Sequence, residues 1–155
     1  MNIIKKMIVV ASLLVAFGCA PIDPQIGAND YNHGYDTRVD FVTLAGVRIQ
    51  NNSASFIPSS ELIDSIYYRV KSCIDVSFDI SPLVILQDTA PVETPDFNGI
   101  TYFDNYLTIM NVSRSEWSTY QLLNHELIHS FLAASGLDSG QNSGHKSPYF
   151  ATCME

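Results

Sequence analysis

The sequence predicts a small α+β domain, and three observations lead to that prediction. The chain has 155 residues, a length typical of one domain with a single hydrophobic core. Hydrophobic residues make up 46% of the chain and charged residues only 15%, which argues against an intrinsically disordered protein. Short stretches typical of strands lie between two stretches whose apolar residues recur at helical spacing. The expected sheet is mixed or antiparallel.

The first half of the domain is expected to contain one or two strands and then a helix. Apolar residues within 39–49 indicate the strands, with a turn or bulge at Ala45-Gly46. Ser59-Ser60 offers a helix N-cap, and Glu61 suits a first turn. The apolar spacing that follows predicts an amphipathic helix over 61–74.

Three further strands are expected before the second helix. Val76, Phe78 and Ile80 alternate as in a strand, and 83–86 is a short apolar run typical of a buried strand. Residues 88–98 are polar and contain proline, which indicates a loop. Residues 100–103 and 106–110 then flank Asp104-Asn105, a pattern that predicts a hairpin with a two-residue turn.

The second helix has the strongest signals in the chain. Ser113 and Glu116 fit a capping box, with Ser113 as the N-cap. Gly136 is the expected stop at the C-terminal end. The apolar face between them comprises Trp117, Tyr120, Leu123, Leu127 and Phe131.

The first nineteen residues are expected to be a targeting segment. Lys5 and Lys6 precede a largely apolar run over 7–17, which is too short to cross a bilayer in a helix and suits a secretory signal peptide. Residues 15–19, Val-Ala-Phe-Gly-Cys, resemble the lipobox of bacterial lipoproteins, although alanine stands where leucine is usual. The resemblance implies cleavage after residue 18 and a lipid on Cys19. An ordinary signal peptide is the alternative.

This interpretation divides the chain into a signal peptide over 1–18, a lipidated cysteine and flexible tether over 19–37, and a domain over 38–155. The residue after Cys19 is alanine, which in such lipoproteins favours an outer-membrane protein that faces the periplasm or the cell surface. Removal of residues 1–18 takes away two lysines and no acid, so the net charge changes from −8 to −10. An acidic chain without a basic stripe is not expected to bind nucleic acid. Contact with the membrane is expected through the lipid alone.

Two cysteines remain in the expected mature chain. In an oxidising periplasm Cys73 and Cys153 can form a disulfide, which would close a loop of about 80 residues. Two separate buried thiols are equally compatible with the sequence, because a sequence gives no distance between them.

The second helix contains His125-Glu126-Leu127-Ile128-His129. Two histidines four residues apart on a helix project from one face, so both imidazoles can reach one cation, and Zn²⁺ suits neutral imidazole. Glu126 lies next to the first ligand and is expected to act as a general base on a zinc-bound water. This HExxH pattern resembles that of the zincin metallopeptidases, a resemblance that implies a zincin-like domain whose active-site helix carries the motif.

The third ligand distinguishes the zincin families. The chain lacks the glycine and histidine of the short metzincin pattern. A thermolysin-like site would need a later glutamate, and only Glu155 follows; an aspzincin-like site would use Asp138, but the residues around it do not match. His145 remains as the candidate. It lies 16 residues after His129, beyond a segment rich in serine and glycine that can fold back toward the helix.

The stretch from His125 to Phe150 resembles the SprT-like metallopeptidases, in which HExxH is followed after a comparable gap by a third histidine and an aromatic residue. That resemblance implies a shared three-histidine zinc core and does not extend to the substrate. In zincins an aromatic hydroxyl or a histidine often donates a hydrogen bond to the developing oxyanion, a role open to Tyr149, although core packing is the alternative for this residue. Met154 is a candidate for a floor beneath the metal.

Together these observations predict an envelope-anchored zinc metalloendopeptidase with one Zn²⁺. An extended peptide or protein substrate is expected to pair with an edge strand around 106–110. The oligomeric state is left open, with a monomer as the expectation. The alternative is a non-catalytic binding or surface-exclusion lipoprotein on the same scaffold, and a phage or mobile-element origin fits either function. A fourth protein ligand such as Asp138 would favour structural zinc.

Overall fold

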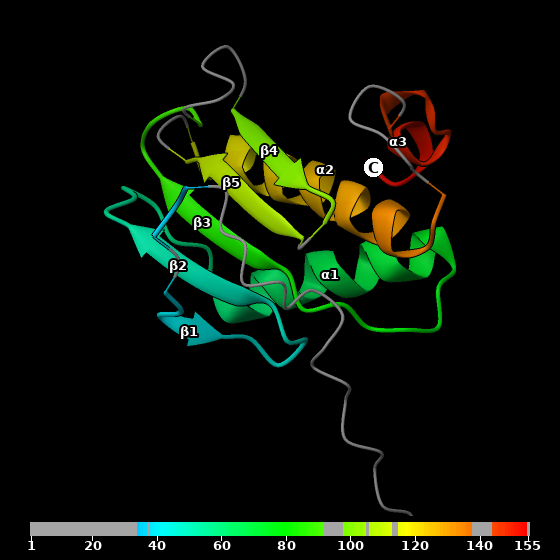
Figure 1. Cartoon of the computed structure of the whole chain (residues 1–155), viewed down its shortest axis with the longest axis horizontal. Coiled ribbons are helices and arrows are strands. Elements are labelled where there is room, and N and C mark those ends of the chain that lie inside the picture. The colour runs from blue at the N-terminus through cyan, green and yellow to red at the C-terminus, as the bar shows by residue number, and fades with distance from the viewer. Residues whose placement is uncertain are drawn as a thin grey trace, which may run out of the picture.

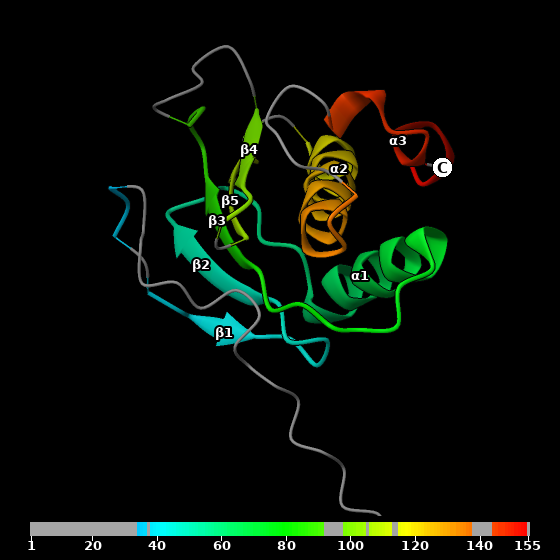
Figure 2. The same ribbon diagram turned by 45° about the vertical axis from the view of Figure 1, so that its right-hand side comes forward.

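The computed structural model describes residues 34–36, 38–91, 98–104, 106–112, 115–137 and 144–154 of the chain. These residues form an α+β fold in which a five-stranded mixed sheet carries all the helices on one face (Figures 1 and 2). The expected signal peptide and the lipidation site at Cys19 lie outside the described residues. Within the described part of the chain, no helix has the length and apolar character needed to span a membrane.

The sheet has the strand order β1-β2-β3-β5-β4. Its two inner pairs, β2–β3 and β3–β5, are parallel, and its two outer pairs, β1–β2 and β5–β4, are antiparallel. The strands are β1 (Phe41–Val42), β2 (Arg48–Asn52), β3 (Leu83–Gln87), β4 (Gly99–Tyr102) and β5 (Leu107–Asn111). The predicted hairpin is therefore formed by β4 and β5, but the expectation of an edge strand around 106–110 is wrong. Strand β5 is bonded on both sides, and β4 is the edge.

Helix α1 (Ser60–Ile74) forms as predicted. Ser59 is the N-cap, and its side chain accepts a hydrogen bond from the backbone N–H of Leu62 at 3.2 Å. Its buried face, from Ile63 to Ile74, includes Tyr67, whose ring is fully buried and whose hydroxyl accepts the N–H of Ile80 at 2.8 Å. The same hydroxyl donates to the Ile80 carbonyl at 3.0 Å. The strand predicted over 76–80 is therefore wrong, because this side chain satisfies the backbone groups of Ile80 in place of a neighbouring strand.

Helix α2 (Glu116–Ala134) begins two residues later than the capping box predicts. Ser115 is the N-cap, and its side chain accepts from the N–H of Ser118 at 3.1 Å. Glu116 is then the first helical residue, too early in the helix to reach back as a capping-box partner. The C-terminal stop is as expected. Gly136 has a φ of +70°, and its N–H and that of the next residue close a Schellman motif on α2.

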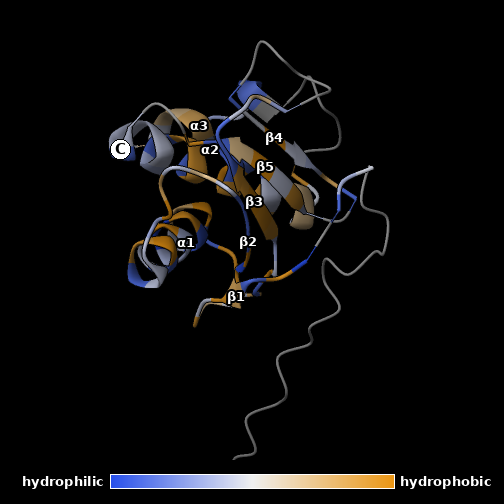
Figure 3. Cartoon of the chain, turned by 90° about the vertical axis from the view of Figure 1, so that its left-hand side faces the viewer, coloured by the Kyte–Doolittle hydropathy of each residue, from blue (hydrophilic) through white to orange (hydrophobic). Residues whose placement is uncertain are grey.

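Two hydrophobic clusters pack on opposite faces of the sheet. Side chains alternate along β3, so Val84 and Leu86 face the helices whereas Leu83 and Ile85 face the other cluster. Strands β3 and β5 and much of α2 are correspondingly apolar (Figure 3). The second half of α2 is buried on nearly all sides, whereas Trp117 in its first turn is 69% exposed. Trp117 thus lies outside the apolar face to which the sequence assigned it.

The end of the expected tether contacts the sheet. Tyr35 packs against the second cluster, and the backbone carbonyl of Asp36 accepts a hydrogen bond from Nε2 of the buried Gln50 at 2.7 Å. Tyr35 and Asp36 are therefore part of the packed structure.

Candidate metal centre

Three histidines from two parts of the chain converge beside α2. His125 and His129 lie one turn apart on this helix, and His145 comes from the short 3₁₀ helix η1 (Gly144–Lys146). The Nε2 atom of His145 lies 3.0 Å from Nε2 of His125 and 3.2 Å from Nε2 of His129. The three ligand atoms all lie within 4.8 Å of one another, which is compatible with one metal ion. His145 is therefore brought to the two helix histidines across the intervening segment.

The spacing of these nitrogen atoms fits a metal ion. Four ligands arranged tetrahedrally at about 2.0–2.1 Å from Zn²⁺ stand about 3.3 Å from one another. Two of the three pairs of ligand nitrogen atoms, at 3.0 and 3.2 Å, have separations close to that value, and all three atoms lie within 4.8 Å of one another. Within the described ranges, the ligand cluster contains no cysteine, aspartate or glutamate. A set of three imidazoles suits zinc and several other transition metals, so the donor set alone does not identify the ion.

The environment of His125 favours the neutral imidazole, the form that binds a metal. Burial, together with the nearby His145, lowers the pKa of His125 to about 4. His129 is buried, whereas His145 is exposed. The cluster is thus covered on the helix side and reaches solvent at His145.

An aromatic ring packs against all three histidines. The ring centroid of Phe150, in α3 (Tyr149–Thr152), lies 4.8 Å from that of His125, 4.6 Å from that of His129 and 5.2 Å from that of His145. Phe103, which follows β4, lies 5.8 Å from the His129 ring. These two phenylalanines provide an apolar wall for the site, a role that the sequence analysis did not assign to either.

Tyr149 and Met154, the other C-terminal candidates, occupy different surroundings. Tyr149 is partly buried against the main hydrophobic cluster, and Phe150 is the residue of α3 in ring contact with the histidines. An oxyanion role for Tyr149 stays a prediction. Asn124, the residue before His125, donates a hydrogen bond from Nδ2 to the sulfur of Met154 at 3.3 Å.

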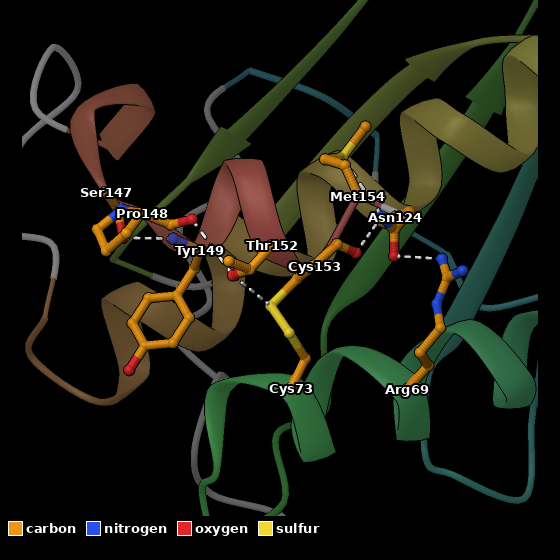
Figure 4. The surroundings of a disulfide bond; sticks show 9 residues. All are labelled: Arg69, Cys73, Asn124, Ser147, Pro148, Tyr149, Thr152, Cys153 and Met154. Atoms are coloured by element: carbon orange, nitrogen blue, oxygen red, sulfur yellow. Dashed lines mark hydrogen bonds between the residues drawn. A yellow bond between two sulfur atoms is a disulfide. The ribbon is translucent and has the colours of Figure 1, made fainter.

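The C-terminal segment is tied to both long helices. A disulfide joins Cys73 of α1 to Cys153 just after α3, with the two Cα atoms 5.8 Å apart (Figure 4). Asn124 of α2 donates to the carbonyl of Cys153 at 2.9 Å and accepts from Nη2 of Arg69 at 2.7 Å. The segment that supplies His145 and Phe150 is thereby anchored to α1 covalently and to α2 by hydrogen bonds. The sequence left the disulfide open and gave no signal for Asn124.

Glu126 is not a member of the histidine cluster, and its side chain contacts strand β4. The residue is 3% exposed, and Oε2 accepts a hydrogen bond from the hydroxyl of Thr101 in β4 at 2.6 Å. Burial raises the pKa of Glu126 to about 7, and the Thr101 hydrogen bond opposes that shift. Glu126 is buried beside the edge strand. Because burial raises its pKa, this carboxyl group can accept a proton near neutral pH.

Comparison with known proteins adds no assignment: no protein-family model, no curated protein and no solved structure matches the chain. The alternative third or fourth ligands, Asp138 and Glu155, lie outside the described residues.

Proposed function

We propose that the protein is a zinc-dependent metallopeptidase of zincin type. The observation that carries this proposal is the convergence of the Nε2 atoms of His125, His129 and His145, with Glu126 next to the first of them in the helix. Three nitrogen ligands leave a fourth position for a water molecule or substrate, as in catalytic zinc sites, whereas structural sites are closed by a fourth protein ligand.

The residues of the site would have two different roles, metal binding and proton transfer. The three histidines hold the ion, and zinc, when bound, supplies a Lewis acid that polarises the scissile carbonyl and makes water at the site more acidic. Glu126 takes a proton from the attacking water and delivers it to the leaving amine. Burial, which raises the pKa of Glu126, favours the uptake of a proton by this carboxyl group.

The substrate would be an extended peptide that adds to β4. This strand is the edge of the sheet, and its outer side carries the backbone groups with which a peptide can pair. Thr101 of β4 contacts Glu126, and Phe103, two residues later, contacts the ring of His129. The edge strand therefore runs past both the proposed base and a metal ligand, which supports peptide binding along β4.

The location proposed for this activity is the cell envelope. We retain from the sequence the signal peptide over 1–18, lipid on Cys19 and an outer-membrane position, with the domain acting as a monomer. A disulfide between Cys73 and Cys153 is compatible with an oxidising compartment of this kind.

Zinc analysis combined with a hydrolysis assay tests the proposed function. The purified protein is expected to carry one zinc ion per chain and to cleave a fluorescently labelled unfolded protein. Chelation should abolish cleavage, and added zinc should restore it. Glu126→Gln should keep the zinc and lose about 10²–10⁴-fold in rate, the usual contribution of general acid–base catalysis.

Three results would count against the proposal. A native protein that binds no metal would exclude the metal-dependent enzyme. Equal rates in the wild type and in Glu126→Gln would exclude Glu126 as the base. A zinc-loaded protein that cleaves no unfolded protein or peptide would favour the alternative, a non-catalytic binding lipoprotein on this scaffold.

A further inference from the structure

A chain of buried hydroxyl groups ends on the carboxyl group of Glu126. Thr101 of β4 donates to Oε2 of Glu126 at 2.6 Å, and its oxygen lies 2.8 Å from the hydroxyl oxygen of Thr108 in β5. An ionised carboxylate only accepts hydrogen bonds, so Thr101 must be the donor to it and Thr108 the donor to Thr101. All three residues are buried. The sheet therefore presents one oriented hydroxyl to one oxygen of the carboxylate.

The other carboxylate oxygen lies against a residue without a side chain. A Cβ atom placed on Gly99 would stand 2.5 Å from Oε1 of Glu126 and 3.0 Å from Cδ1 of Leu122. Gly99 and Thr101 are two positions apart in β4, so they face α2 on the same side of the sheet. Within the described part of the chain, no hydrogen-bond donor reaches Oε1. One oxygen is thus held by a hydroxyl, and the other lies against the backbone of the edge strand at Gly99.

We propose that Thr101 and Gly99 are positioning residues for Glu126: the Thr101 hydroxyl fixes the rotation of the carboxylate, and Gly99 provides the space that Oε1 occupies. This inference rests on the proposed function, in which Glu126 is the base. It assigns to β4 a second role besides pairing with a substrate peptide. The strand holds the proton-accepting oxygen at a defined place, and misplacement of a catalytic group by about 1 Å can cost about 100-fold in rate.

Three substitutions separate positioning from simple structural support. Thr101→Val keeps the shape and removes the hydroxyl, Thr101→Ser keeps the hydroxyl, and Gly99→Ala moves Oε1. The alanine substitution keeps both threonine hydroxyl groups, and the atom that must give way is the end of a flexible side chain. Thr43→Val is the matched control, because Thr43 is also buried but lies near β1, at the opposite edge of the sheet.

Steady-state kinetics and a carboxyl resonance provide the two readouts. Thr101→Val and Gly99→Ala are expected to lower kcat about 10- to 100-fold with little change in KM and with full zinc content. Thr101→Ser should return kcat to within a few fold of the wild type. In protein labelled with ¹³C at glutamate carboxyl groups, the Glu126 signal, identified by its absence in Glu126→Gln, should shift in Thr101→Val and not in Thr43→Val.

The two readouts also distinguish failure of this inference from failure of the proposed function. Unchanged kcat and an unchanged carboxyl signal in folded Thr101→Val would overturn the positioning role. Loss of zinc together with kcat in the Thr101 and Gly99 variants would also overturn it, because it would show a structural role. A wild type without any hydrolytic activity would contradict the proposed function, and the carboxyl signal would still decide whether Thr101 holds Glu126.

Discussion

Cys73 and Cys153 are separated by 80 positions in the sequence and are joined by a disulfide that links α1 to the end of α3. The segment over 144–154 contains only one turn of 3₁₀ helix and one four-residue helix, yet it contributes His145 and Phe150 to the candidate metal centre. The position of the third histidine therefore depends on this bond and on the hydrogen bonds of Asn124 to the same end of the chain.

Removal of the disulfide is expected to weaken metal binding. The variant Cys73→Ser/Cys153→Ser loses the link that holds the C-terminal segment, so zinc affinity should fall together with a loss of about 4 kcal/mol in the free energy of unfolding. Competition with a chromophoric chelator measures the affinity, and urea titration measures the stability. Wild-type protein treated with a dithiol reductant should behave like the variant. Unchanged zinc affinity in both would show that the segment holds its place without the bond.

The aromatic wall is expected to support the three imidazoles. Phe150→Ala opens a gap beneath all three rings, so we expect at least a tenfold loss of zinc affinity, whereas Phe150→Leu should lose less. Isothermal titration calorimetry on the metal-free protein measures the change. Trp117→Ala is the control, because Trp117 is an exposed aromatic residue of α2, the helix that carries His125 and His129. If both alanine variants bind zinc as the wild type does, the wall has no role in binding.

Burial of Glu126 makes the stability of the metal-free protein depend on pH. Burial raises the pKa of this carboxyl group from 4.5 to about 7, so the folded chain binds the proton more tightly than the unfolded chain. The stability that this group contributes is fully present below about pH 4.5 and is lost as the pH rises through 7. Glu126→Gln lacks this loss, so its free energy of unfolding should rise relative to that of the wild type as the pH increases between those values.

Urea unfolding of both metal-free proteins at pH 4.5, 6 and 8 measures this difference. All other ionisable groups are the same in the two proteins, so their contributions cancel in the comparison. A constant difference between the two proteins over this range would show that Glu126 has an ordinary pKa in the folded state.

The helices could be predicted because their signals are local. Ser59 caps α1 through the adjacent backbone, and Gly136 ends α2 because it adopts the positive φ that a Schellman motif requires. The start of α2 was misplaced because two serines, Ser113 and Ser115, both precede the helix. Only the geometry of the first turn selects Ser115 as the N-cap.

The order of the strands could not be predicted, because it depends on pairing between distant segments. The hairpin pattern shows that β4 and β5 pair but not which of them lies beside β3. The structure shows the difference: Leu107 to Met110 is entirely buried, as expected for a strand between two others, whereas β4 begins with the less buried Gly99 and Ile100.

The candidate site was predictable only where a motif specifies it. The spacing of His125 and His129 requires a shared helix face, and elimination of other ligands led to His145. Thr101 had no comparable signal, because a threonine in a strand is most often a packing residue, and for Phe150 the resemblance indicated only an aromatic residue after the third histidine. Their contacts with the histidines and with Glu126 arise from tertiary packing alone.

Zinc K-edge X-ray absorption of the purified full chain tests the central claim, a three-histidine site with an open fourth position, most directly. The account predicts one zinc ion per chain, with three imidazole nitrogen atoms at about 2.0–2.1 Å and one further light atom from water. The His145→Ala variant should show two imidazole ligands and a weaker affinity for the ion. Sulfur ligands, or fewer than three imidazole ligands in the wild type, would contradict the claim. An unchanged spectrum in His145→Ala would also contradict it.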